Sequence, residues 1–320
     1  MASQPPKVLI FGATGKVASS AALAAHTHGA SVTLALRNPL KPTPFAPLNT
    51  SPSVFPRVQA DLSIPSSLSA AVTTSGATRA FVYVVYTTDD NMLSSFTALR
   101  DAGVTFVVLL SSYAVPRGDL TSLDEEGDYI AWKHAQIELA LGNVFGVEGC
   151  GYVAIRGGYF ATNATLWREE LKRGGEVKLW AGGAEFDWVP PEDVGEVAGV
   201  IVAGEEEVLR KGEVVVDVVG GELLSQREVL EVVGRELFGR DVQVGEMKRE
   251  EAVRFFREGL SIPEKSARTL VEQQTEREKG GDRLYGEVYF GESVGMAERF
   301  LGRPVMRFGE WVKKNKDMFL

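Results

Sequence analysis

Short apolar runs alternate with amphipathic stretches along the first half of the chain. The apolar runs lie at 8–11, 31–36, 58–62, 79–86, 105–110 and 151–155, and stretches with helical periodicity lie between them at 15–28, 63–72, 91–102 and 128–142. Runs that are apolar throughout are typical of strands covered on both faces, and strands that alternate with helices build a parallel sheet. The pattern therefore predicts an α/β fold built on a Rossmann-type, doubly wound parallel sheet.

The second half predicts a smaller C-terminal α/β lobe. Helices are predicted at 163–173, from 193, and at 225–238, 249–258, 263–278 and 307–316, with short strands at 177–180, 184–189 and 214–219. We assign 1–158 to a nucleotide-binding core and 159–320 to a substrate-binding lobe, in which 186–204 and 214–219 return to the core. The charged run that begins at Glu264 is interpreted as a solvated helix face, with a partner-binding surface as the alternative. The tract 41–56, which holds five prolines, predicts a surface loop near the adenosine end.

The first apolar run breaks into a glycine-rich turn within the segment VLIFGATGKVA (8–18). Glycine at 12 and 15 allows a positive φ in the turn and lets a phosphate approach the N–H groups at the start of the following helix. The spacing is G-x-x-G-x-x-A rather than the commoner G-x-G-x-x-G, so its position between a strand and a helix supports the interpretation. We expect the pyrophosphate of a dinucleotide here, with an ordinary glycine-rich turn as the alternative.

Two further strand ends bear on which nucleotide binds. Arg37 follows the second apolar run. At this position an NAD-specific site carries an acidic residue that binds the ribose 2′-OH, whereas in an NADP-specific site an arginine can pair with the 2′-phosphate. This favours NADP(H) as the cofactor, unless Arg37 is a solvated surface cation. The third run ends at Asp61 and Leu62, which we place beside the adenine. Asp61 accepts a hydrogen bond from the adenine amino group in one interpretation and caps the next helix in the other.

Composition and charge limit the class of protein. With 320 residues, 44% of them hydrophobic, the chain can bury a large core, and its single cysteine, Cys150, excludes an internal disulfide. The net charge is −9, yet residues 1–118 hold eight Lys or Arg and four Asp or Glu. The positive half is therefore the part predicted to hold phosphates, and direct binding to nucleic acid is disfavoured.

The start of the chain has too short an apolar run for a signal peptide and no stretch reaches the length of a membrane span, which predicts a cytoplasmic protein. No metal site, Ser-His-Asp arrangement or P-loop is evident.

Candidate catalytic residues follow the fifth apolar run. That run leads into Ser111 and Ser112, and the next helix carries Tyr129 and Lys133, which share one helical face. A lysine ammonium beside a phenol favours the phenolate and can also hold the nicotinamide ribose. Tyr129 would then be the acid or base, and Ser112 would orient the substrate oxygen. In the alternative, Tyr129 is a packing residue and Lys133 alone touches the cofactor.

Aromatic residues gather at the start of the lobe. Tyr159, Phe160, Trp167 and Trp188 are candidates for an aromatic wall around a flat substrate, and ordinary core packing is the alternative for each tryptophan. We therefore expect the partner of this protein to be a small apolar or aromatic molecule.

Six segments carry a family likeness that covers nearly the whole chain. They are VLIFGATGKVA (8–18), LALRNP (34–39), FVVLLSS (106–112), the helix with Lys133 and Glu138, YVAIRGGYFATNA (152–164) and FDWVPPEDVGEVA (186–198). Together they resemble the NmrA-like branch of the atypical short-chain dehydrogenases/reductases. The resemblance implies that the adenine-side phosphates are held by Gly12, Thr14, Gly15, Val17 and Arg37, and the nicotinamide ribose by Lys133. It also implies that residues 156–160, with Tyr159, close over the nicotinamide.

The function that this resemblance implies is reduction. The branch includes isoflavone-reductase-like enzymes, quinone reductases, fungal reductases of specialised metabolism and redox-sensing regulators that bind NADP without turning it over. The first expectation is an NADPH-dependent oxidoreductase of specialised metabolism, a monomer or homodimer that transfers hydride to a carbonyl, iminium, quinone or enone of an apolar small molecule. The alternatives are a non-catalytic NADP(H)-binding sensor or regulatory protein of the NmrA type, and a cofactor-retaining isomerase or cyclase.

Overall fold

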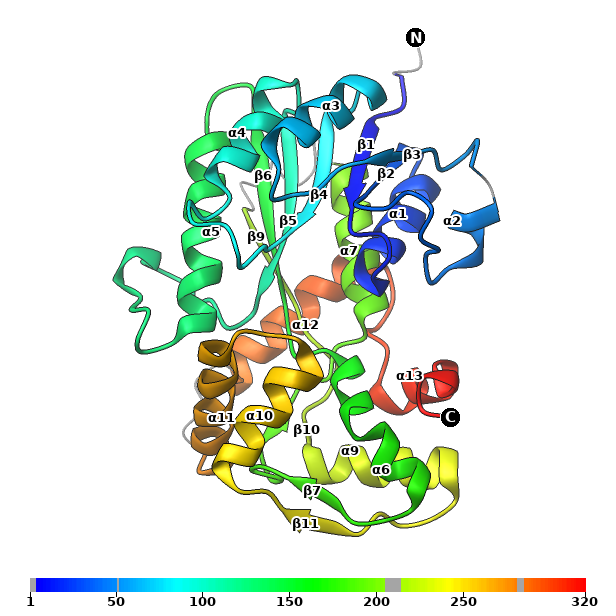
Figure 1. Cartoon of the computed structure of the whole chain (residues 1–320), viewed down its shortest axis with the longest axis vertical. Helices are drawn as coiled ribbons and strands as arrows, with labels where there is room; N and C mark the ends of the chain where they lie inside the picture. The colour runs from blue at the N-terminus through cyan, green and yellow to red at the C-terminus, as the bar shows by residue number, and fades with distance from the viewer. Residues whose placement is uncertain (1–3, 51, 205–213, 281–284) are drawn as a thin grey trace.

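A seven-stranded sheet forms one half of the molecule, at the top of Figure 1. The computed structural model describes residues 4–50, 52–204, 214–280 and 285–320. The strand order is β3-β2-β1-β4-β5-β6-β9, and every neighbouring pair is parallel. The strands are β1 (Lys7–Phe11), β2 (Ser31–Leu36), β3 (Arg57–Gln59), β4 (Arg79–Tyr83), β5 (Phe106–Ser112), β6 (Gly151–Gly157) and β9 (Val215–Val218). The order reverses between β1 and β4, which confirms the predicted doubly wound fold.

Helices cover both faces of this sheet. One face carries α1 (Lys16–Thr27), α7 (Pro191–Ala203) and α12 (Glu287–Leu301), and the other carries α3 (Pro65–Ser75), α4 (Leu93–Asp101) and α5 (Tyr129–Phe145). Successive strand residues point to opposite faces, so Val8 and Ile10 of β1 pack in the first layer and Leu9 and Phe11 in the second. This two-sided burial is the physical reason that the strands are apolar throughout.

Helix α7 approaches α1 very closely, because two glycines of α7 face it. A β carbon added at Gly195 would lie 2.2 Å from the carbonyl oxygen of Val17, and one at Gly199 would lie 2.5 Å from that of Ala21. An alanine at either position would overpack the interface, which typically costs about 1–3 kcal/mol. The first turn of α1, where the glycine-rich turn ends, is therefore held rigidly against the body of the protein.

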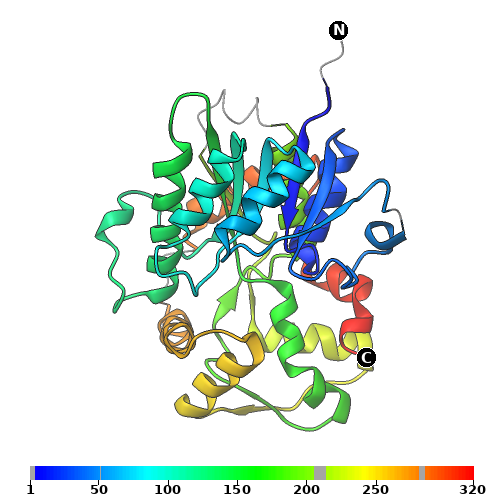
Figure 2. The same ribbon diagram turned by 45° about the horizontal axis from the view of Figure 1, so that its top comes forward.

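The second half of the molecule is a lobe below the carboxyl ends of the strands (Figures 1 and 2). It contains η2 (Ala161–Trp167), α6 (Arg168–Arg173), β7 (Val177–Leu179), β8 (Glu185–Phe186), β10 (Leu224–Ser225), α9 (Gln226–Val233), η3 (Gly234–Phe238), β11 (Val244–Glu246), α10 (Arg249–Leu260), α11 (Glu264–Glu278), α13 (Phe308–Lys314) and η4 (Lys316–Met318). Its core is built around large aromatic side chains, among them Trp167, Trp188 and Trp311. The predicted capping box is present at the start of α9, where Ser225 and Glu228 cap each other's backbone N–H groups.

Several predicted elements differ from the observed ones. The tract 41–56 contains a short helix, α2 (Ala46–Thr50), and β3 is limited to three residues. The strand predicted at 184–189 reduces to β8 because Trp188 has a φ of +42°, which an extended strand cannot contain. Helix α12 was not predicted, since Gly291 and Gly295 interrupt its apolar pattern. No helix in the described part of the chain is both long and apolar enough to cross a membrane.

Candidate functional site

The glycine-rich turn between β1 and α1 has the geometry of an anion-binding site. Gly12 has a φ of +78°, and the N–H of Gly15 donates to the carbonyl oxygen of Gly12 at 2.8 Å. The Ser19 hydroxyl donates to the carbonyl oxygen of Ala13 at 2.7 Å and so stabilises the conformation of the turn. A β carbon added at Gly15 would have only the Gly12 oxygen nearby, at 3.5 Å, so the space in front of the helix start is open. A phosphate group fits this position, where N–H groups of the first helical turn face it.

A cavity of about 340 Å³ continues from this turn towards the ends of β2 and β3. It is lined by Phe11, Gly12, Thr14, Ala35, Leu36, Arg37, Asn38, Lys41, Ala60, Leu62 and Tyr83. Among the described residues that line it are two cations, Arg37 and Lys41, and no carboxylate. Arg37 is exposed, and its guanidinium makes no hydrogen bond or ion pair with another described residue. Its backbone carbonyl oxygen accepts a hydrogen bond from the side chain of Gln59. The structure thus brings Gly12, Thr14, Arg37 and Leu62 together at one cavity, whereas Gly15 and Val17 lie beside it at the start of α1.

Tyr83 is a residue of this cavity that the sequence analysis missed. A β carbon at Gly12 would lie 2.7 Å from Cε1 of the Tyr83 ring, so the glycine is required by this contact as well as by its φ. Burial raises the pKa of the Tyr83 hydroxyl, which keeps it neutral. The position of Tyr83 at the end of β4 could have indicated its place in this cavity. The carboxyl ends of β1 and β4 lie side by side where the strand order reverses, so a side chain at the end of β4 lies next to the glycine-rich turn.

Asp61 holds a turn rather than capping a helix. Its carboxylate accepts hydrogen bonds from the backbone N–H of Ser63 at 2.9 Å and from the Ser63 hydroxyl at 2.7 Å, while the N-cap position of α3 belongs to Ile64. Burial opposes ionisation, but these hydrogen bonds and the charge of Arg37 keep the pKa of Asp61 below its usual value. The adenine contact of Asp61 stays a prediction, since the residue does not line the cavity although Leu62 does.

A second, smaller cavity of about 90 Å³ lies at the carboxyl ends of β5 and β6. It is lined by Ser112, Tyr113, Ala114, Ile130, Gly157, Gly158, Tyr159, Phe186, Leu270, Gln273, Gln274, Arg277 and Tyr285. We call it the strand-end cavity. The Ser112 oxygen accepts a hydrogen bond from the N–H of Ala114 at 3.2 Å, and the Tyr159 ring stacks on Phe186 with 4.1 Å between ring centres. Ligands of open α/β sheets bind outside the carboxyl ends of the strands, which is where this cavity lies.

The predicted Tyr129–Lys133 pair lies beside the strand-end cavity and does not line it. Tyr129 stacks near Tyr86, with 6.5 Å between ring centres, and the Lys265 ammonium lies 5.5 Å from the centre of the Tyr129 ring. Lys133 is buried, and its Nζ donates to Oδ1 of Asn91 at 2.7 Å and to the carbonyl oxygen of Thr88 at 3.2 Å. Burial lowers the pKa of Lys133. The structure brings Ser112 to the cavity, and the catalytic role of Tyr129 stays a prediction.

A buried polar network supports this end of the sheet. The Tyr86 hydroxyl lies 2.9 Å from Nε2 of His134, and the Ser111 hydroxyl donates to Glu138, which pairs with Arg156 at 2.7 Å. Burial lowers the pKa of His134 to about 4, and the charge of Arg156 acts in the same direction, so the imidazole is neutral at pH 7. Among the residues the structure describes, no three His, Cys, Asp or Glu side chains are grouped to hold a metal ion.

The four aromatic residues predicted to contact substrate do not line one common cavity, although the centre of the Trp188 ring lies 5.1 Å from that of the Tyr159 ring and 6.4 Å from that of the Trp167 ring. Tyr159 lines the strand-end cavity, and Phe160 packs against the core of the sheet. Trp188 is 1% exposed, and its Nε1 donates to the carbonyl oxygen of Leu224 at 2.7 Å, so it is a core residue of the lobe. Trp167 is also 1% exposed and borders a different cavity.

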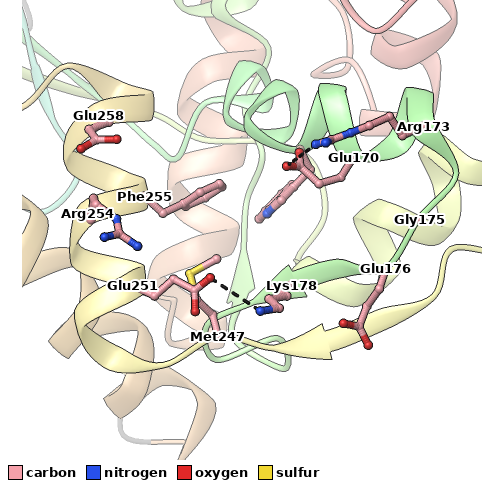
Figure 3. Close-up of a pocket in the computed structure, with 11 residues that line it drawn as sticks. Glu170, Arg173, Gly175, Glu176, Lys178, Met247, Glu251, Arg254, Phe255 and Glu258 are labelled. Atoms are coloured by element: carbon pink, nitrogen blue, oxygen red, sulfur yellow. Dashed lines mark hydrogen bonds and ion pairs between the residues drawn. The ribbon is translucent and has the colours of Figure 1, made fainter.

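That third cavity, of about 550 Å³, lies within the lobe between α6–β7 and β11–α10 (Figure 3). Its rim carries both signs of charge, with Lys178 and Glu251 3.8 Å apart and Arg173 and Glu170 3.2 Å apart. Phe255 lies on its inner side, where its ring stacks near that of Trp167. None of the residues that line it belongs to the seven-stranded sheet or to the strand-end cavity.

The whole chain is similar in sequence and fold to proteins already characterised. No model of a known protein family matches it. The nitrogen metabolite regulation-like protein bik4 of Gibberella fujikuroi is 33% identical over 96% of this chain and 96% of its own length. The solved structure of an NADPH-dependent quinone oxidoreductase from Escherichia coli has a TM-score of 0.68 at 18% identity, covering 96% of this chain and 98% of that one. The negative transcriptional regulator NmrA, solved in complex with NAD, has a TM-score of 0.64 at 15% identity, covering 98% of this chain and 96% of that one.

Proposed function

The chain belongs to the nitrogen metabolite regulation-like (NmrA-like) family of atypical short-chain dehydrogenases/reductases, and from this premise we propose that it is an NADPH-dependent reductase of an apolar small molecule. The phosphate-binding turn and the strand-end cavity supply the two halves of such a site. The substrate group that receives the hydride is a carbonyl, quinone, iminium or enone.

The turn and the 340 Å³ cavity fit the adenosine half of NADPH. The N–H groups at the start of α1, beside Gly15 and Val17, would hold the pyrophosphate, and Arg37 with Lys41 would pair with the 2′-phosphate. The lining offers no carboxylate for an unphosphorylated ribose, which supports NADP(H) over NAD(H). The E. coli quinone oxidoreductase that shares this fold is described as NADPH-dependent.

The strand-end cavity fits the reacting end. When bound, NADPH would supply a hydride; a carbonyl, quinone or enone takes up one proton in addition, whereas an iminium ion becomes a neutral amine without one. Ser112 would hold the substrate oxygen by its hydroxyl, and Lys133 with Asn91 would hold the ribose from the other side. Stacked side chains from the lobe, Tyr159 on Phe186, would form an apolar wall at this end of the cleft.

One observation carries the proposal: a cavity lined by hydroxyl and amide groups lies at the carboxyl ends of the strands, in addition to the phosphate site. The test is calorimetric titration with NADPH and NADH together with absorbance-followed NADPH oxidation against quinones, enones, aldehydes and cyclic iminium ions. We expect preferential NADPH binding and turnover of at least one class. Binding without turnover of any class would contradict the reductase.

An NADP(H)-binding sensor is the second candidate. It is favoured by the names of two similar proteins, a nitrogen metabolite regulation-like protein and a negative transcriptional regulator. It is also favoured by the position of Tyr129, whose side chain does not line the strand-end cavity. The affinity of a sensor for its protein partner would differ between the NADPH-bound and the NADP⁺-bound form. A sensor would also leave every compound of the panel unreduced.

A further inference from the structure

The helix that closes the strand-end cavity, α11, is attached to both halves of the molecule. On the side of the sheet, Lys265 pairs with Glu125 and Glu126 at 2.8 Å each, and Gln273 donates to Oδ2 of Asp128 at 2.7 Å. On the side of the lobe, the Trp180 indole donates to a carbonyl of α11 at 3.0 Å. In both ribbon views α11 lies directly below the end of α5 (Figures 1 and 2). Side chains of α11 that face the cavity are therefore held in place from both sides.

Gln274 is the most constrained of these side chains. It is fully buried, and its Oε1 accepts a hydrogen bond from Nε2 of Gln226 at 3.3 Å. The orientation of the Gln226 amide is itself fixed, because its two N–H groups donate to the carbonyl oxygens of Trp180 at 2.8 Å and Ala181 at 2.9 Å, and the longer contact with Gln274 shares one of these hydrogens. A nitrogen of Gln274 in place of its oxygen would face another nitrogen, so the oxygen must point to Gln226 and the amide N–H₂ must point elsewhere.

That amide nitrogen has no hydrogen-bond partner among the described residues, although Gln274 lines the strand-end cavity. Buried polar groups in proteins are nearly always paired, with protein or with a bound molecule. Of the other described residues that line the cavity, Ser112 contributes a hydroxyl and Arg277 a positive charge, and none is an Asp or Glu. The cavity therefore presents donors and a cation, and the group that complements it is an acceptor oxygen.

We propose that Gln274 is a substrate-binding residue, whose amide donates to the oxygen of a carbonyl, quinone or enone, and that this site selects such substrates against cationic iminium ions. The proposal rests on the proposed reductase function and narrows its substrate class. A neutral or anionic oxygen pairs with the donors, whereas an iminium cation offers no acceptor and meets Arg277. Gln274 thus determines specificity from the lobe, while Ser112 acts from the sheet.

The experiment uses the full chain with four proteins: wild type, Gln274→Met, Gln274→Glu and Gln243→Met. Methionine keeps the length of the side chain and removes the donor, and Gln243 is an exposed glutamine of the lobe that serves as the matched control. The probes are menadione as the quinone and an N-methylated cyclic iminium ion. The readouts are the Kd of each probe for the NADP⁺ complex by tryptophan fluorescence, the Kd of NADPH by calorimetry, and kcat and KM. Thermal melting checks that each variant is folded.

We expect Gln274→Met to raise the Kd and KM of menadione about tenfold, as the loss of one hydrogen bond predicts, with NADPH affinity unchanged and Gln243→Met equal to wild type. Gln274→Glu replaces the donor by an anion, so it should weaken the binding of menadione further and strengthen the binding of the iminium ion. A side chain that only packs would not reverse the preference for menadione over the iminium ion. Unchanged menadione binding in a folded Gln274→Met variant overturns the proposal, as does a wild type that binds the iminium ion as tightly as menadione or binds neither probe. Turnover without a Gln274 effect refutes this assignment alone, whereas a Gln274 effect on binding without turnover refutes the reductase alone.

Discussion

The two ends of the cleft are built in different ways. The end proposed to hold phosphate, called the phosphate end, is one continuous stretch from Gly12 to the first turn of α1, and it presents backbone N–H groups. The strand-end cavity is assembled from β5, β6, α5, α11 and the segment at Tyr285, and it presents side chains. Backbone groups do not titrate and depend on local conformation alone, whereas the side chains depend on packing across the whole molecule. The two ends should therefore respond differently to pH, to substitution and to the choice of cofactor.

The largest expected difference concerns pH, because only the strand-end side rests on a buried histidine. The folded chain holds His134 neutral with a pKa of about 4, while the unfolded chain binds a proton near pH 6.5. His134 therefore contributes stability above pH 6.5 that is lost as the pH falls towards 4, by up to about 3 kcal/mol. In His134→Gln this part of the pH dependence should disappear. Urea unfolding at pH steps from 7 to 4 measures it, with the exposed His26→Gln as control. Equal slopes in wild type and His134→Gln would refute the assignment.

At the phosphate end, Gly12→Ala should weaken NADPH binding by about a hundredfold, since the new β carbon meets both a positive φ and the Tyr83 ring. Gly29→Ala is the matched control, because Gly29 has a φ of +86° and nothing within 4 Å of an added β carbon. It should cost about 1 kcal/mol of stability and leave binding unchanged. Calorimetry and urea unfolding distinguish the two, and similar NADPH affinities in both variants would show that the turn does not bind phosphate.

Arg37→Ala sharpens the comparison within the phosphate end. The Arg37 charge lies at the cavity beside the end of β2. Its removal should weaken NADPH binding about tenfold to fiftyfold, because a charge-assisted contact to the 2′-phosphate is lost. NADH, which lacks that phosphate, should bind as before. Calorimetric titration of both cofactors is the measurement. Equal losses for NADPH and NADH would assign Arg37 to a general role in the fold of this end.

The smallest effect is expected for Tyr129→Phe. Its side chain does not line the strand-end cavity, so kcat on an accepted substrate should change less than about twofold, whereas Ser112→Ala should reduce kcat about tenfold. Steady-state kinetics at saturating NADPH provide the comparison. A large loss in Tyr129→Phe with a minor one in Ser112→Ala would restore the tyrosine as the proton donor.

Local sequence determined most of the fold and the phosphate end. The alternation of apolar runs and helical stretches predicted the parallel sheet, and the six motifs predicted membership of the NmrA-like family, which is confirmed. Gly12, Thr14, Arg37 and Leu62 line one cavity because a turn between a strand and a helix, and the end of a neighbouring strand, are local features whose positions follow from strand order. Their contact with a cofactor stays a prediction.

The strand-end cavity was decided only by tertiary structure. The charged run from Glu264 to Arg283, whose last three residues lie outside the described part of the chain, was interpreted as a solvated helix face. Val271 and Gln274 are nevertheless buried, and Arg277 lines the cavity. Gln274 lies more than 100 positions from Ser112 in the sequence, and no local periodicity indicates that the two share a cavity. Local patterns determine which segments form strands, helices and turns, because those choices depend on neighbours along the chain. Which distant side chains meet at the ends of the strands depends on how the lobe and α11 pack against the sheet, and that is set by contacts the linear pattern does not contain.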